Sequence, residues 1–228
     1  MKGKLIIIES GTDGSGKATQ TQILYEKLKS EGRKVMKITF PNYESDSSAI
    51  VKMYLNGDFG ETADDIDPYV SSTFFSIDRY ASFKKEWEKY YNDGYIIISD
   101  RYTTSNMIHQ GAKMKREEVE KYIDWLEDYE YNFYKIPKPD FVLFLDVDTD
   151  TSFKLMEGRK NKIDGSDEKD IHESDREYLE RSYEVSKYIS EKYGWEIIDC
   201  VDENGMKSID SISEEIYEKT EEFLYDIE

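Results

Sequence analysis

The sequence predicts an α/β fold in which a five-stranded parallel sheet is covered by helices on both faces. Short apolar runs of strand length alternate with longer amphipathic stretches along most of the chain, and this alternation is typical of a parallel sheet. In addition, the first apolar run leads directly into a glycine-rich turn and then a helical pattern. The 228 residues contain no internal repeat or low-complexity tract, so we expect a single domain spanning residues 1–228.

The strands are assigned to runs rich in isoleucine, valine and phenylalanine, and the helices to longer stretches with apolar residues at helical spacing. In chain order, the expected strands are Lys4–Ile8, Lys34–Phe40, Tyr95–Ser99, Asp140–Asp146 and Trp195–Cys200. The expected helices are Lys17–Glu31, Ser47–Leu55, Tyr69–Asn92, Arg116–Phe133, Asp150–Glu157, Glu173–Tyr193 and Ser208–Tyr225. The expected helices end just before the next strand at Gly32, Gly94, Gly194 and the Pro137–Pro139 pair. Residues Gly158–His172 are dense in charge without periodicity, so we expect a loop or lid there.

Composition limits the classes of partner. A formal net charge of −19 argues against nucleic acid, which clustered Lys and Arg would bind. No apolar run is long enough to cross a bilayer, and no signal peptide precedes the first strand, so we expect no membrane partner. Cys200 is the only cysteine, which excludes an intrachain disulfide and a cysteine-rich zinc site and favours a reducing, cytoplasmic setting.

The glycine-rich turn predicts a phosphate-binding loop. Gly11, Gly14, Gly16 and Lys17 match the G-x-x-x-x-G-K pattern in register between a strand and a helix. Glycines let backbone N–H groups point inward, and the N-terminus of the next helix adds positive potential. We expect Lys17 to reach the outer phosphates of a nucleotide. Such a ligand is compatible with the net charge only if the cations are concentrated in one cleft while the carboxylates stay on solvated helices. The residue after the lysine, which is normally Ser or Thr and helps hold magnesium, is Ala18.

Two further clusters follow the same strands. The third strand delivers Asp100 and Arg101, and a carboxylate at this position of a phosphate-loop protein orients magnesium or its waters, although an ion pair capping the next helix is the alternative. Phe75 and Arg79 are four residues apart and share one helical face, where a ring and a guanidinium could stack on a base and donate to its carbonyl. Core packing is the alternative for the aromatic side chain, because aromatics at helical spacing more often lie in the core.

Two other patterns are set aside. Residues 161–164 match the N-K-x-D motif by which GTPases read guanine, but they follow a helical run inside the charged lid rather than a strand. His109 and His172 have no second ligand at metal-binding spacing, so neither indicates a metal site.

Together the motifs resemble those of the thymidylate kinases. The shared features are the phosphate loop, Phe40-Pro41 after the second strand, Phe75-Ser76-x-x-Arg79, Asp100-Arg101-Tyr102-x-x-Ser105, Gln110-Gly111 and a basic lid, in that order. The similarity extends from Lys4 to about Cys200. It implies a P-loop kinase three-layer sandwich that phosphorylates dTMP to dTDP with ATP and Mg²⁺. It also implies a homodimer.

The resemblance implies a role for each matching residue. Lys17 and its loop would hold the ATP phosphates, with Gly11, Asp13, Gly14, Ser15, Gly16, Ala18 and Thr19 as the other loop positions. Phe75 would stack on thymine, Arg79 would donate to its O4, and Gln110 would lie by its N3 edge. Arg101 would hold the acceptor phosphate, Asp100 would work with magnesium, and Asp13 would lie near the acceptor 3′-hydroxyl. Arg159, with Lys160 and Lys162 nearby, resembles a lid cation. Phe40, Tyr43, Ser105 and His109 complete the expected substrate site.

Three positions depart from the family pattern. Ala18 removes the expected magnesium hydroxyl, Tyr43 stands where many members have an arginine, and His109 replaces the usual Tyr or Phe that crowds a ribose 2′-hydroxyl. Two other functions are therefore kept beside thymidylate kinase. A deoxynucleoside kinase would need a carboxylate just after the second strand, where Phe40-Pro41-Asn42-Tyr43 supplies none. A non-catalytic nucleotide sensor would be favoured if Ala18 abolishes magnesium binding.

Overall fold

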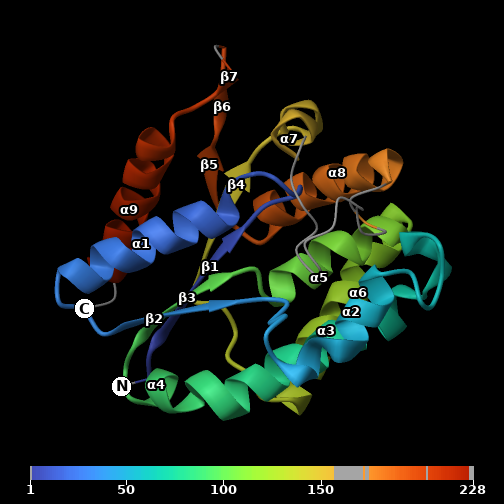
Figure 1. Cartoon of the computed structure of the whole chain (residues 1–228), viewed down its shortest axis with the longest axis horizontal. Coiled ribbons are helices and arrows are strands. Elements are labelled where there is room, and N and C mark those ends of the chain that lie inside the picture. Colours follow the sequence, from blue (N-terminus) through green and yellow to red (C-terminus); the bar gives the residue numbers. More distant parts are fainter. Residues whose placement is uncertain (1, 157–171, 173–174, 204, 226–228) are drawn as a thin grey trace.

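The five-stranded parallel sheet is confirmed. In the computed structural model, which describes residues 2–156, 172, 175–203 and 205–225, the strands follow the order β2-β3-β1-β4-β5 and all neighbours are parallel (Figure 1). They are β1 (Lys4–Glu9), β2 (Val35–Thr39), β3 (Ile96–Asp100), β4 (Phe141–Asp146) and β5 (Glu196–Asp199). Each strand begins or ends within a residue of the predicted bounds, because its apolar run is bounded by a turn signal.

Nine α-helices lie in the described part of the chain. They are α1 (Lys17–Ser30), α2 (Ala49–Leu55), α3 (Pro68–Ser82), α4 (Glu88–Asn92), α5 (Thr103–His109), α6 (Arg116–Glu127), α7 (Thr149–Met156), α8 (Arg176–Lys192) and α9 (Ile209–Tyr225). None of the described helices is both long and apolar enough to span a bilayer.

The helices cover both faces of the sheet because β1 buries side chains on both sides. Ile6 and Ile8 face a core shared with α1 and α9, which includes Leu24 and Ile216. Leu5 and Ile7, one residue out of phase, face the opposite core, where Trp87 packs. Further along this second face, α5, α6 and α8 pack around Phe144 of β4. Figure 1 shows α1 and α9 together on one side of the sheet, with α3, α5, α6 and α8 on the other.

The helical predictions need three corrections. The stretch predicted as one helix over Tyr69–Asn92 is divided into α3, a π-helical turn (Phe83–Trp87) and α4. The predicted helix Arg116–Phe133 is α-helical only to Glu127 and ends in a second π-helical turn, Asp128–Phe133. Helix α5 was not predicted, because its Thr-Thr-Ser-Asn start has weak helix propensity and burial of Met107 and Ile108 stabilises it instead. A small hairpin, β6 (Val201–Asp202) with β7 (Gly205–Met206), was also missed.

The sheet register brings three chain segments to one edge. Ile8 pairs with Asp100, and Thr39 pairs with the same aspartate from the other side. The backbone continues this contact beyond the strands: Arg101 N donates to Ile8 O over 3.2 Å, and Phe40 N donates to Asp100 O over 3.0 Å. The glycine-rich loop, the Phe40-Pro41 segment and the Asp100-Arg101 pair therefore meet at the carboxyl ends of adjacent strands, where open parallel sheets bind ligands.

Candidate active site

A cavity of about 390 Å³ lies at this edge of the sheet. Its lining contains most of the predicted site residues: Asp13, Gly14, Ser15, Gly16, Lys17, Ala18, Thr19, Phe40, Tyr43, Phe75, Arg79, Asp100, Arg101, Ser105, His109 and Gln110. The lining also includes Thr39, Pro41, Asn42, Glu44, Leu55, Tyr102, Asn106 and His172. The sequence-based prediction therefore identified residues that the fold brings together from the loop after β1, the start of α1, the segment after β2, the end of β3, α3 and α5.

The loop between β1 and α1 forms one wall of the cavity. Gly14 and Gly16 have φ angles of 82° and 89°, a left-handed region in which side chains are strained. Gly11 differs from the other predicted loop positions because it does not line the cavity. A Cβ at Gly11 would lie 2.1 Å from Ser186 Oγ. The described structure therefore gives Gly11 a packing role against α8.

Lys17 folds back into its own loop. Its ammonium nitrogen donates to Ser10 Oγ at 2.5 Å, Thr12 O at 2.9 Å and Ser15 Oγ at 3.3 Å. Burial and the nearby charge of Arg101 lower the pKa of Lys17 to about 7. An anion bound in the loop would oppose both effects, so the site is electrostatically prepared for a phosphate.

Arg101 connects the loop to α5. Its guanidinium donates to Asp13 Oδ1 and lies 3.0 Å from His109 Nε2. Beneath it, the buried carboxylate of Glu9 lies 3.9 Å from Arg101 Nη1 and accepts hydrogen bonds from the hydroxyls of Thr104 and Ser105. Burial alone would lower the pKa of Arg101, but the carboxylates of Asp13, Glu9 and Asp100 outweigh it and raise the pKa. Arg101 is thus a permanent cation in the cavity wall.

The residues beside the loop fit a magnesium ion. Asp100 lines the cavity, and its buried Oδ1 has no hydrogen-bond partner among the described residues, which suits an oxygen ligand for a hard cation. Ala18 faces the cavity without a ligand atom. The hydroxyl of Thr21 donates to Lys17 O at 2.8 Å within the helix, so it does not replace the missing group. Thr19 lines the cavity. No cluster of three or more His, Cys, Asp or Glu side chains is found in the described ranges.

The lining contributed by α3 and α5 includes an aromatic ring and two polar side chains. Phe75 and Arg79 come from α3 and Gln110 from the end of α5. Gln110 Oε1 accepts a hydrogen bond from Ser71 Oγ at 2.6 Å, and Ser71 Oγ lies 3.2 Å from the Lys113 ammonium. An amide oxygen has two lone pairs, so Gln110 retains one acceptor position for a ligand N–H.

Arg79 is both part of the cavity lining and buried. It forms an ion pair with Glu130, which is also buried. The prediction that carboxylates stay on solvated helices is therefore wrong for Glu130 and for Glu9. Each of these carboxylates faces a cavity arginine, and no sequence motif marked either one.

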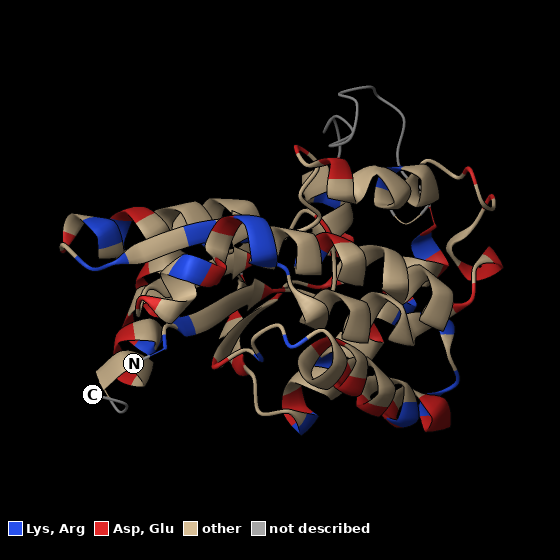
Figure 2. Ribbon diagram, turned by 90° about the horizontal axis from the view of Figure 1, so that it is seen from below, with Lys and Arg blue, Asp and Glu red and all other residues tan. Residues whose placement is uncertain are grey.

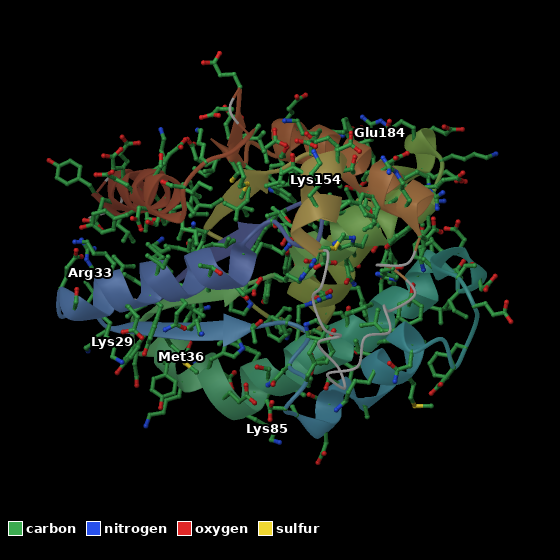
Figure 3. The ribbon with its side chains drawn as sticks, turned by 45° about the horizontal axis from the view of Figure 1, so that its top comes forward. Lys29, Arg33, Met36, Lys85, Lys154 and Glu184 are labelled. Atoms are coloured by element: carbon green, nitrogen blue, oxygen red, sulfur yellow. The ribbon has the colours of Figure 1, made fainter. Side chains whose placement is uncertain are left out.

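The remaining charges lie mostly on the outside. Lys/Arg and Asp/Glu alternate along the helices (Figure 2), and Lys29, Arg33 and Lys85 lie at the periphery of the molecule (Figure 3). Arg33, for example, is paired with Glu221 on α9 at 2.6 Å. Among the described residues, three Lys or Arg side chains line the cavity: Lys17, Arg79 and Arg101.

Two predicted elements cannot be placed. Arg159, Lys160, Lys162 and the N-K-x-D match lie outside the described residues, as does the predicted lid except for His172. His172 lines the cavity, with its ring centroid 6.2 Å from that of His109. The sequence analysis treated these histidines as isolated. His109 and His172 are 63 positions apart in the sequence, and spacing along the chain does not predict a contact between residues so far apart.

Comparisons with known proteins show the family of the chain. The family model described as thymidylate kinase matches residues 8–204. The thymidylate kinase of Mycobacterium tuberculosis is 30% identical over 193 residues, covering 84% of this chain and 87% of the relative. The human thymidylate kinase is 29% identical over 146 residues, covering 64% and 62%. A solved thymidylate kinase structure from Candida albicans is similar with a TM-score of 0.67 and 25% identity, covering 97% of this chain and 93% of that chain. The chain belongs to the thymidylate kinase family.

Proposed function

We propose that this protein transfers the γ-phosphoryl group of ATP to dTMP, producing dTDP and ADP. Membership of the thymidylate kinase family supports this reaction. The single observation in the structure that carries it is the shared cavity: a phosphate loop with Lys17 at one end and a base-sized polar edge formed by Arg79 and Gln110 at the other. Arg101 lies between the two ends, where an acceptor phosphate would be held.

The chemistry needs alignment and charge neutralisation more than proton transfer. The acceptor is a phosphate that is already charged at neutral pH, so no strong general base is required. Lys17 would hold the donor phosphates and Arg101 the acceptor phosphate, and both would stabilise negative charge in the transition state. Arg159 remains a proposed lid cation. Bound Mg²⁺ would neutralise phosphate charge, with Asp100 holding it or its waters.

The base edge favours thymine over cytosine. Arg79 offers N–H donors to a carbonyl at position 4, and Gln110 Oε1 can accept from N3–H. Cytosine presents an amino group and an unprotonated N3 at these two positions, so both contacts become mismatched. His109 replaces a bulkier ring, so selection against a 2′-hydroxyl is not part of this proposal.

A nucleotide panel tests the reaction and its selectivity. In direct competition at saturating ATP, dTMP should be phosphorylated in preference to dCMP by about tenfold to a hundredfold, because an unpaired buried donor costs roughly 1–3 kcal/mol. A coupled ADP-release assay with nucleosides and nucleoside monophosphates measures this. Preference for dCMP would contradict the assignment of Arg79 and Gln110, and preference for a nucleoside would favour the deoxynucleoside kinase.

Lys17 should couple ATP binding to the uptake of a proton. Because its pKa in the free protein is about 7, Lys17 is mostly neutral at pH 8, and bound phosphates should raise that pKa and protonate it. ATP binding at pH 8 should therefore take up close to one proton, measured by calorimetry in buffers of different ionisation enthalpy. His172, whose pKa burial lowers to about 3, stays neutral at this pH. Proton uptake that persists in Lys17→Met would assign it to another group.

Ala18 allows a test of how magnesium is held. Magnesium keeps several waters and needs only one or two protein carboxylates, so the wild type should be active with Asp100 alone. Ala18→Thr should lower the half-saturating concentration of free magnesium and leave the affinity for dTMP unchanged. The measurement is the phosphoryl-transfer rate against free magnesium for both proteins. An inactive wild type that the threonine rescues would favour the nucleotide sensor, and identical curves would show that position 18 does not face the metal.

We also propose a homodimer in a reducing, cytoplasmic compartment. An aromatic strip on α6 and the second π-helical turn supports the dimer. Trp125 and Tyr129 stack at 5.3 Å, Tyr129 and Phe133 at 6.1 Å, and Phe133 is 73% exposed. Exposed apolar patches of this kind mark protein interfaces. Sedimentation velocity distinguishes a dimer from the 26.9 kDa monomer.

A further inference from the structure

Glu130 has a fully satisfied carboxylate deep behind the base edge of the cavity. It lies in the π-helical turn Asp128–Phe133 and is 0% exposed. Its oxygens accept four hydrogen bonds: from Arg79 Nε at 2.7 Å and Nη2 at 2.5 Å, from Ser76 Oγ at 2.7 Å and from Thr103 Oγ1 at 2.9 Å. A carboxylate has about four acceptor positions, so all of them are directed at these neighbours.

The two bonds to Arg79 fix the guanidinium plane. They form a side-by-side fork, the arrangement that restrains an arginine most strongly. The fork uses Nε and Nη2, and Nη1 makes only a long contact of 3.4 Å to Tyr102 O. Three of the five N–H groups thus have partners within the described structure, and the rest remain for a ligand in the cavity that Arg79 lines.

In the described ranges, Glu130 is the only carboxylate that forms an ion pair with Arg79. Asp78 precedes it in the chain, but its oxygens accept from Asn42 N at 2.8 Å and Ser47 Oγ at 2.6 Å. A guanidinium buried without a partner is strongly disfavoured. The position of Arg79 in the cavity wall therefore depends on Glu130.

Glu130 also joins the separate parts of the cavity. Arg79 and Ser76 belong to α3, and Thr103 begins α5, two residues after Arg101. The buried carboxylate of Glu130 thus links α3, which carries Arg79, to the start of α5, which follows Arg101. A displaced Glu130 would change the direction of the Arg79 donors and leave the phosphate loop intact.

We propose that Glu130 is a positioning residue for base selection: it orients Arg79 so that the free N–H groups meet the 4-carbonyl of a thymine-like base. This inference rests on the proposed function, because it assumes a pyrimidine nucleotide in the cavity. It extends that function by naming the residue that holds the N–H donors of Arg79 in a fixed orientation.

The decisive variant is Glu130→Gln, which keeps the shape and removes the charge. We expect the ratio of kcat/KM for dTMP to that for dCMP to fall by about tenfold or more, as loss of a directed hydrogen bond predicts. KM for dTMP should rise while KM for ATP stays within about twofold. The matched control is Glu127→Gln, at the end of α6 just before the same turn. The carboxylate of Glu127 pairs with Lys138 at 2.7 Å instead of with Arg79. This control should retain the wild-type ratio.

A double-mutant cycle separates positioning from stability. If Glu130 acts through Arg79, Glu130→Gln should not reduce the ratio further in an Arg79→Ala background. A purely structural carboxylate would lower the melting temperature and leave the ratio unchanged, and that result in a folded Glu130→Gln protein would overturn the proposal. Should Glu130→Gln fail to fold, Glu130→Asp keeps the charge, withdraws it by one methylene and gives the same readout.

Binding distinguishes failure of this inference from failure of the proposed function. The affinities of wild type and Glu130→Gln for dTMP and dCMP can be measured by calorimetry without turnover. A wild type that binds dTMP selectively but transfers no phosphoryl group would refute the proposed reaction, and loss of that selectivity in Glu130→Gln would still support Glu130. Equal selectivity of binding in both proteins would refute Glu130 alone.

Discussion

The cavity depends on the pairing of buried arginines with buried carboxylates. Arg79 lies in the wall because Glu130 neutralises it, and Arg101 lies there because Glu9 and Asp13 surround it. Breaking such a pair by removing one partner leaves an uncompensated buried charge and is strongly destabilising. The same pairs restrict the guanidinium groups to one orientation each, so the fold fixes the donors before any nucleotide arrives, which limits the ordering cost of binding.

This arrangement explains how a chain with a formal net charge of −19 can offer an anion site. The surface carboxylates are interspersed with Lys and Arg (Figure 2), and their interactions are screened by salt. Inside the cavity, screening is weaker, so Lys17 and Arg101 in its wall can act on a bound phosphate at short range. Lys17, whose pKa burial lowers to about 7, adds a charge that a bound phosphate itself would stabilise.

The sheet and the cavity lining could be predicted because they depend on local signals. The apolar runs define the strands, and the parallel register then brings Lys17, Asp100 and Arg101 to one edge. Helix α5 could not be predicted, because burial stabilises it against a weak local propensity. Nor could Glu9 and Glu130. Glu130 lies in an acidic stretch of the sequence in which nothing distinguishes one carboxylate from the next. It is buried, unlike its exposed neighbours, only because α3 packs against α5 and α6.

The central claim is that one cavity holds ATP at Lys17 and a thymine nucleotide at Arg79 for direct transfer between them. The most direct test is phosphorus NMR of ATP and dTMP with magnesium, using wild type and Lys17→Ala samples matched by circular dichroism. We predict equal amounts of dTDP and ADP from the wild type, and loss of turnover in Lys17→Ala. The fold should be unchanged, because Ser15 Oγ still donates to Ser10 Oγ and Ser10 Oγ to Thr12 O when the lysine is removed. Lys17→Ala activity within a few-fold of wild type, or ADP and inorganic phosphate without dTDP, would contradict the claim.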